Sequence, residues 1–152
     1  MARVIGGGDF GNHLDVPCWP DSTLKTEIDA LILLGTAVEG SKLVSLTWSN
    51  NYEVTSPADG AIPDGRIIKV EKDATNGYLL TVRLWSYIDQ NSARHSPTQV
   101  VTLPYTTGAA PALQDSVVIN STTYMAVKDG TSGGFGAVIS LNTTNETVDV
   151  IF

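Results

Sequence analysis

From Leu43 to the last residue, short runs of β-branched and aliphatic residues alternate with turn residues. The clearest example is the turn Asp73–Gly77, which lies between the runs 66–72 and 78–88. An Asn-Gly pair between two such runs is a strong signal for a β-hairpin. In the second run one face carries Tyr78, Leu80, Val82 and Leu84, and the other carries Leu79, Thr81, Arg83 and Trp85. This alternation predicts an antiparallel sheet with one face packed on a core.

The same pattern predicts further strands along the chain. They cover residues 42–48 (extended by 52–54), 98–105, the hairpin 116–119 with 123–128, and the hairpin 137–141 with 147–152. Pro104 predicts that its strand lies at a sheet edge or ends there. Val148, Val150 and Phe152 share one face of the last strand, so the sheet is expected to run to the final residue.

Composition agrees with this fold class and excludes several functions. The 152 residues include 17 Thr, 15 Val and 10 Ile, and charged residues make up 16% of the chain, against roughly 25% in typical globular proteins. A net charge of −7 with scattered Lys and Arg argues against nucleic-acid binding. The longest apolar stretch, residues 30–38, is too short to span a membrane. A single Cys18 suits synthesis in a reducing cytoplasm.

Residues 1–42 have a different character, because prolines and glycines interrupt them frequently. Leu24, Ile28, Leu31 and Ile32 fall at helical spacing, with Ser22 as a candidate N-cap and Gly35 as a candidate end. The overlapping segment 27–38 fits an extended strand equally well, so both alternatives stand.

These patterns predict a mainly β protein with at most one short helix. We expect a single antiparallel β-sandwich or barrel-like domain over residues 43–152, preceded by an extended N-terminal arm and irregular segment over residues 1–42.

The chemical motifs in the chain are weak. Gly6-x-Gly8-x-x-Gly11 matches the dinucleotide-binding fingerprint, but two prolines occupy the place of the required helix. His13 and Cys18 lack the paired ligands of a zinc site, and Cys18 is interpreted as a small packed residue. Asp59 and Asp64 precede glycines, as turn residues do. We therefore predict no catalytic, cofactor-binding or metal-binding residues, and a protein that is not an enzyme.

Arg83, Trp85 and Tyr87 form the best candidate surface patch. They fall on the less buried face of one predicted strand. Burial against another element is the favoured interpretation; burial between chains would make the three residues a subunit or partner contact. A carbohydrate-binding platform is the alternative.

Two stretches resemble the decoration (cement) proteins of tailed-bacteriophage heads. One is PADGAIPDGRIIKVE (57–71) followed by YLLTV (78–82), and the other is GAVISL (136–141) with TVDVIF (147–152). The resemblance to lambda-type members implies a β-tulip-like fold and a homotrimer at three-fold sites on the capsid exterior. There the protein would stabilise the expanded head of the virion, after synthesis in the host cytoplasm. The segment 9–42 has no counterpart in this resemblance.

The resemblance also implies a role for the N-terminal arm, which in that family adds a strand to the sheet of the major capsid protein. Ala2, Arg3, Val4 and Ile5, together with Phe10, are the expected capsid-binding residues, and Gly6–Gly8 would give the arm its freedom.

Two other function classes stand beside this one. A carbohydrate- or receptor-binding β domain of a phage tail or secreted protein predicts an exposed Trp85 and Tyr87. An enzyme would require His95, Arg94 and a carboxylate to converge.

Overall fold

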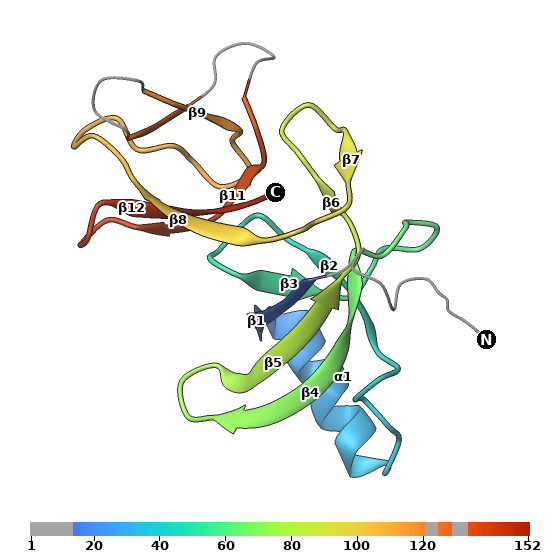
Figure 1. Cartoon of the computed structure of the whole chain (residues 1–152). Helices are drawn as coiled ribbons and strands as arrows, with labels where there is room; N and C mark the ends of the chain where they lie inside the picture. The colour runs from blue at the N-terminus through green and yellow to red at the C-terminus, as the bar shows by residue number, and fades with distance from the viewer. Residues whose placement is uncertain (1–13, 121–124, 129–133) are drawn as a thin grey trace. The chain divides into compact units, whose positions relative to one another are not determined.

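The computed structural model describes residues 14–120, 125–128 and 134–152, and the protein is mainly β with one helix in these ranges (Figure 1). This confirms the predicted fold class, including its barrel-like sheet. The chain divides into two compact units. The barrel unit comprises Met1–Thr47 and Tyr52–Tyr87, and the C-terminal unit comprises Trp48–Asn51 and Ile88–Phe152. The division near residue 87 differs from the expected single β domain that begins at residue 43.

Five strands close the barrel in the order β1-β3-β2-β4-β5. Their bounds are β1 Leu14–Pro20, β2 Leu43–Leu46, β3 Glu53–Thr55, β4 Gly65–Asp73 and β5 Gly77–Leu84. β1 runs parallel to β3 and antiparallel to β5, with Val16 opposite Val82. The other neighbours in the barrel are antiparallel.

The expectation that residues 1–42 are irregular is wrong for β1, which contains Pro17 and Pro20. The amides of Trp19 and Asp21 donate to the carbonyls of Tyr52 and Val54 on the β3 side, at 2.8 and 2.9 Å. Since successive N–H groups of a strand point to opposite sides, the nitrogen of Pro17 also points to the β3 side, before the paired stretch begins. The nitrogen of Pro20 points to the β5 side, beyond the last pair at Cys18. Neither proline therefore removes a ladder bond.

The ambiguous segment is a helix, α1, over Ser22–Leu33. Its N-cap is Asp21 rather than the expected Ser22, and the Asp21 Oδ1 accepts the amide of Leu24 at 2.8 Å. At the other end the amide of Gly35 donates to the Ile32 carbonyl, and that of Thr36 donates to the Leu31 carbonyl. This is a Schellman motif, and the φ of +71° at Gly35 explains why the helix ends there as predicted.

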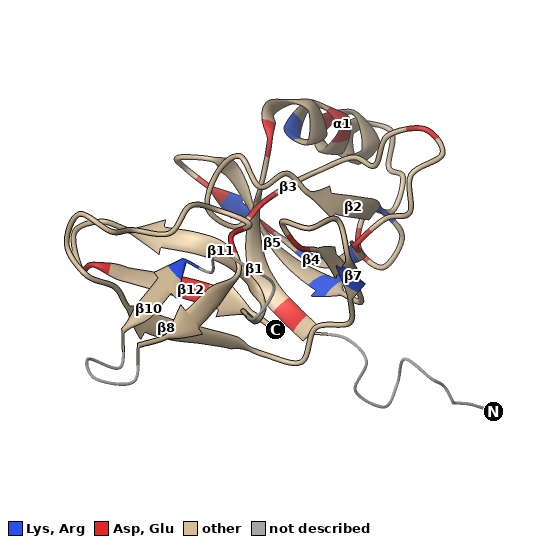
Figure 2. Cartoon of the chain, turned by 90° about the horizontal axis from the view of Figure 1, so that it is seen from above, with Lys and Arg blue, Asp and Glu red and all other residues tan. Residues whose placement is uncertain are grey.

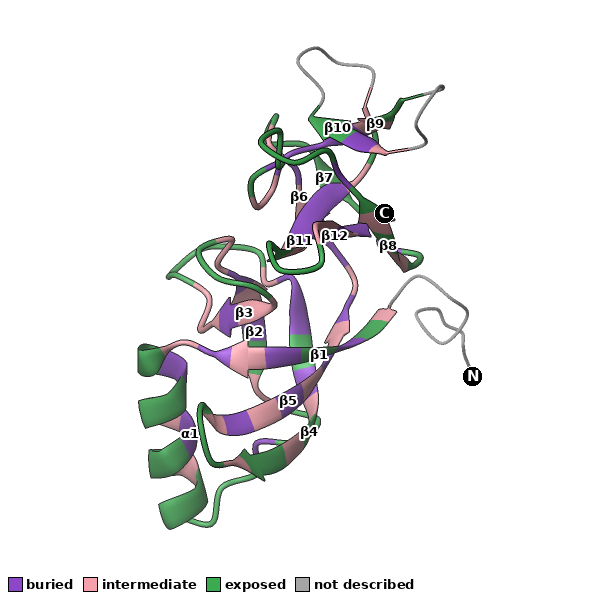
Figure 3. Cartoon of the chain, turned by 90° about the vertical axis from the view of Figure 1, so that its left-hand side faces the viewer, coloured by how far each residue is buried: buried purple, intermediate pink, exposed green. Residues whose placement is uncertain are grey.

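The hairpin β4–β5 is confirmed. Along β5, buried and half-buried residues alternate (Figure 3), and the buried ones are Tyr78, Leu80, Val82 and Leu84. Leu24 and Ile28 of α1 are fully buried in the same unit.

The C-terminal unit contains the remaining strands, apart from Tyr87, the first residue of β6, which belongs to the barrel unit. They are β6 Tyr87–Ile88, β7 Arg94–His95, β8 Val100–Pro104, β9 Val117–Ile119, β10 Ala126–Lys128, β11 Ala137–Asn142 and β12 Thr147–Ile151. β9 and β10 form the expected hairpin, and β11, β12 and β8 form a sheet in that order. β8 is thus an edge strand, as Pro104 predicted.

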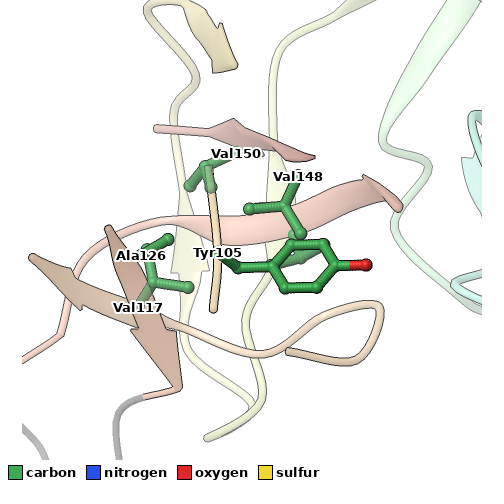
Figure 4. Close-up of a cluster of buried hydrophobic side chains, with 6 residues drawn as sticks. Tyr105, Val117, Ala126, Val148 and Val150 are labelled. Carbon is green, nitrogen blue, oxygen red and sulfur yellow. The ribbon is translucent and has the colours of Figure 1, made fainter. Parts of the chain in front are cut away.

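A cluster of buried side chains in this unit lies on one face of the β11-β12-β8 sheet. Its members are Tyr105, Val117, Ala126, Val138, Val148 and Val150 (Figure 4). Leu103 and Phe152 pack against this cluster. The ring of Phe152 meets that of Phe135 edge to face, with 5.5 Å between centroids. The last residue is therefore partly buried against the core, on the face that the alternation in the last strand predicted.

Candidate functional site

The end of α1 exposes three consecutive aliphatic residues, which we call the apolar ridge. Ile32 is 49% exposed, Leu33 86% and Leu34 77%. Because the Schellman motif turns the chain away at Gly35, no following helical turn covers Leu33 or Leu34. Runs of three exposed aliphatic residues are unusual on the surface of a soluble protein and mark interaction surfaces.

A groove of about 440 Å³ begins at the apolar ridge. Ile32 lines it together with Val38, Val70, Tyr78, Lys72 and Glu39. The backbone of this wall is fixed by the carboxylate of Glu39, which accepts the amide of Val70 at 2.8 Å. The groove thus presents an apolar floor beside the apolar ridge, with one charge of each sign at its margin.

Polar contacts at the groove hold α1 against the β4–β5 hairpin. The hydroxyl of Tyr78 donates to the carboxylate of Asp29, and the Lys72 ammonium lies 5.3 Å from the centre of the Tyr78 ring. The bond to Asp29 raises the pKa of Tyr78 to about 12. The same bond, with the ammonium of Lys25 at 3.2 Å, lowers the pKa of Asp29. The hydroxyl and the carboxylate are both engaged, and their role here is structural.

Tyr87 is buried, as the favoured interpretation of Arg83, Trp85 and Tyr87 expected, whereas Arg83 and Trp85 are half-buried. β5 ends at Leu84, because the amides of Trp85 and Ser86 both donate to the carbonyl of Asp64. Tyr87 is 2% exposed, and the indole of Trp85 donates to the carbonyl of Pro63 at 3.1 Å. Arg83 makes two bonds to Asp15, at 2.8 and 3.0 Å. A partner contact through Arg83 or Trp85 stays a prediction. Because Tyr87 is buried, it cannot be part of an exposed aromatic surface for carbohydrate binding.

The predicted capsid-binding residues lie outside the described residues. Ala2, Arg3, Val4, Ile5 and Phe10 belong to the segment 1–13, as do the glycines of the dinucleotide-like motif and His13.

The candidate catalytic residues Asp64, Cys18 and His95 are buried or hydrogen-bonded within the fold. Asp64 is buried, and it accepts the amide of Leu46 at 3.0 Å. Cys18 is fully buried, and burial raises the pKa of its thiol far above that of a nucleophilic cysteine. His95 bonds the buried carboxylate of Asp89 at 2.7 Å. Burial by itself would raise the pKa of Asp89, but the bonds from His95 and the amides of Ala93 and Asn91 outweigh it and lower the pKa.

A polar hollow of about 280 Å³ lies on the β8-β12-β11 sheet. It is lined by Thr102, Ser140, Asn142, Asn145, Thr147 and Asp149. The hydroxyl of Thr102 donates to Asp149 at 2.6 Å, and the side chain of Asn142 accepts the amide of Asn145 at 3.0 Å. No aromatic residue lines the hollow, so it lacks the stacking surface that the carbohydrate-binding alternative requires.

In the described ranges, no three His, Cys, Asp or Glu residues gather as metal ligands would. The one helix found there is neither long nor apolar enough to cross a membrane. The sequence interpretation missed the apolar ridge, although its signal was present: residues 30–34 are apolar without interruption, which a helix with one buried face does not require.

Comparison with known proteins gave no match among family models, curated proteins or solved structures.

Proposed function

We propose that the protein is a structural protein of a tailed-bacteriophage virion and not an enzyme. In this proposal it binds the major capsid protein on the outside of the head, as a homotrimer at three-fold sites, and stabilises the expanded capsid. The proposal is supported by the β-rich fold, by the resemblance of residues 57–82 and 136–152 to decoration proteins, and by the exposed apolar ridge.

The apolar ridge is the observation that carries the proposal. Burying one leucine side chain contributes about 1.5–3 kcal/mol, so covering Leu33 and Leu34 gives a useful but modest affinity for each subunit. A trimer multiplies such an affinity, because three copies bind a symmetric lattice together. In the proposed arrangement the apolar ridge contacts the capsid protein.

The surface around the apolar ridge fits a protein partner. Residues 30–38 carry no charge, so little charged surface is desolvated when a partner covers the apolar ridge itself. Charged residues lie beside it on α1 and β4 (Figure 2), where Lys25 pairs with Asp29 and Lys69 with Glu71.

The proposal is tested by co-sedimentation with capsids that lack a decoration protein. The double variant Leu33→Gln/Leu34→Gln removes the exposed aliphatic surface. Glutamine has nearly the same helix propensity as leucine, so the end of α1 should keep its conformation. We expect capsid binding to fall at least tenfold with an unchanged melting temperature. Ile62→Gln is the matched control, because Ile62 is 62% exposed on a loop of the same unit and is expected to leave binding intact. Full binding by the double variant would contradict the role of the apolar ridge.

The oligomeric state is a second test. Sedimentation equilibrium of the native protein is expected to give three times the chain mass of 16.1 kDa. Failure of the native protein to bind any capsid of its phage would overturn the proposed function. The expected contact of Ala2, Arg3, Val4, Ile5 and Phe10 with the capsid stays a prediction, and deletion of Met1–Gly8 tests it.

A further inference from the structure

The two edges of the β11-β12-β8 sheet differ in how many of their outward main-chain groups are hydrogen-bonded. At the β11 edge the amide of Gln114 donates to the carbonyl of Val138 at 2.8 Å, and the amide of Val138 donates to the carbonyl of Asp115 at 2.9 Å. Further along, the side-chain amide of Asn51 donates to the carbonyl of Leu141 and accepts its N–H, both at 3.0 Å. The Asn51 amide thus substitutes for a neighbouring strand. This edge is covered.

Within the part of the chain that the structure describes, the β8 edge has no such cover. Gln99 and Phe152 exchange both main-chain bonds at 2.9 Å, and the amide of Tyr105 donates to the carbonyl of Glu146. These bonds show that the odd-numbered residues of β8 face β12, so the N–H and C=O groups of Val100 and Thr102 point outward. Among the described residues, no main-chain partner meets these outward groups.

The open part of β8 is short and uncharged. Its C-terminal end is closed, because Pro104 has no N–H and Tyr105 forms an isolated bridge with Ala126. What is left is the stretch 100–102, with two N–H and two C=O groups available to an added strand. Natural edge strands usually carry a charge or a bulge that discourages pairing. β8 carries neither, and its register with β12 is regular.

We propose that this edge binds residues 2–5 of a second copy of the chain, added as an antiparallel strand. The inference rests on the proposed homotrimer and deepens it by naming a subunit contact. It names a neighbouring subunit as the partner of the N-terminal segment, whereas the resemblance to decoration proteins implies the capsid protein; the deletion of Met1–Gly8 described below separates the two alternatives.

The sequence of the segment fits the open edge in one register. With Arg3 opposite Thr102, Val4 falls opposite Val101 and Ile5 opposite Val100, and the four outward main-chain groups pair with Arg3 and Ile5. Arg3 then lies on the face that carries Asp149, the carboxylate beside Thr102. Arg3 is the only Lys or Arg among the thirteen residues that precede β1, and it meets a negative charge in this register.

The side chains on the opposite face match as well. Val101 pairs with Val150, a member of the buried cluster, yet it is only half-buried, and no strand among the described residues flanks it on the outer side. Val4 in the proposed register extends that apolar row by one residue. In a trimer each subunit gives one strand and receives one, so the contact closes into a ring of three.

A cysteine pair tests the register directly. In Val4→Cys/Val101→Cys the two new thiols face each other at a non-hydrogen-bonded pair, where Cβ atoms lie about 4.5–5.5 Å apart before any adjustment. Mild oxidation is expected to give disulfide-linked chains, up to the covalent trimer, on a non-reducing gel. The native Cys18 does not compete, because it is fully buried. Val4→Cys/Leu103→Cys is the control, displaced by two residues, and should link at least tenfold less.

A proline tests the main-chain bonds. Thr102→Pro removes an outward N–H and leaves the bonds to β12, whereas Thr102→Ala removes only the hydroxyl that contacts Asp149. We expect sedimentation equilibrium to give the mass of one chain for Thr102→Pro and of three chains for Thr102→Ala. Deletion of Met1–Gly8 should act as Thr102→Pro does. If Thr102→Pro fails to fold, the cysteine pair decides the question.

The outcomes separate this inference from the proposed function. No linked chains above the control, a link within one chain, a native monomer, or a trimer that survives deletion of Met1–Gly8 would each overturn the inference. If the deleted chain stays trimeric and loses capsid binding, the segment contacts the capsid instead. If the native trimer links at Val4 and Val101 but binds no capsid, the inference holds and the proposed function fails.

Discussion

At the scale of single residues, Tyr78 shows how one polar contact joins two elements that are distant in sequence. Its ring is buried in the barrel unit, while its hydroxyl reaches Asp29 on the exposed side of α1. Ionising the tyrosine next to that carboxylate is unfavourable, which explains why its pKa rises to about 12.

This contact predicts the titration of one of the five tyrosines. In the native protein, absorbance at alkaline pH should reveal a tyrosine that ionises near 12. Asp29→Ala should move that transition down toward the ordinary value of about 10. Tyr78→Phe, which removes the transition altogether, assigns it. An unchanged titration in Asp29→Ala would contradict the assigned cause.

Glu27 gives the protein a defined acid sensitivity. Its carboxylate accepts bonds from Lys42 at 2.8 Å and from Ser56 at 2.7 Å, and these bonds lower its pKa. A lowered pKa in the folded state means that this carboxylate stabilises the fold above the unfolded pKa, near 4.5. The stabilisation is lost as the pH falls through the folded pKa.

Glu27→Gln should therefore remove part of the pH dependence of stability. We expect the free energy of unfolding to fall less between pH 7 and pH 3 in Glu27→Gln than in the native protein, measured by denaturant titration at each pH. Glu71→Gln is the control, because Glu71 has only a long contact to Lys69, at 3.8 Å on the surface. Equal pH dependence in the native and Glu27→Gln proteins would contradict the prediction.

At the scale of elements, Gly65 decides how closely two strands of the barrel approach β4. It pairs with Val44 on β2 and with Leu84 on β5. A Cβ at this position would lie 2.3 Å from the carbonyl oxygen of Arg83, which belongs to the backbone and has no freedom to move aside. Only glycine allows this approach.

Gly65→Ala should accordingly destabilise the barrel unit by about 1–3 kcal/mol, the usual cost of overpacking. The comparison is Gly40→Ala, where a Cβ meets nothing within 4 Å and only the φ of +80° opposes the change. That second variant should cost about 1 kcal/mol, the scale of a glycine's conformational advantage. Thermal unfolding of both variants measures the difference, and a smaller loss for Gly65→Ala would contradict the steric argument.

Element by element, the predictions succeeded where the signal is local. The turn 73–77 and the alternation after Tyr78 predicted the β4–β5 hairpin, and Pro104 predicted the edge position of β8. β1 was missed, because prolines at positions 17 and 20 argue against a strand unless the neighbours of each nitrogen are known. Those neighbours come from β3 and β5, far along the chain.

At the scale of the whole molecule, one continuous stretch of the chain supplies all five strands of the barrel. β1 to β5 lie within residues 14–84, and β1 closes the ring through β3 and β5. A chain ending at Tyr87 should therefore fold, with a cooperative melting transition and a β-type circular dichroism spectrum. A chain of residues 21–87, which lacks β1, should lose the transition because the ring is opened. Equal melting of the two chains would contradict the closing role of β1.

The candidate surfaces also differ in whether the sequence or only the fold reveals them. Strand parity pointed to Trp85 and Tyr87, but parity fails because the strand ends and the chain bends at Trp85, where the amides of Trp85 and Ser86 donate to the carbonyl of Asp64. The apolar ridge and the open β8 edge were recognised because, among the described residues, no other part of the chain covers them. Exposure of this kind is a property of the assembled fold.

The sequence by itself determined the β class, the hairpins and the helical spacing of α1, because turn chemistry and side-chain alternation act between residues only a few positions apart. The tertiary structure decided that β1 closes a barrel, that Tyr87 is buried, and that Leu33, Leu34 and the outer side of β8 are left exposed. Each of these depends on pairing or burial between residues tens of positions apart. A local sequence pattern does not specify which distant segment pairs with a strand or covers a side chain.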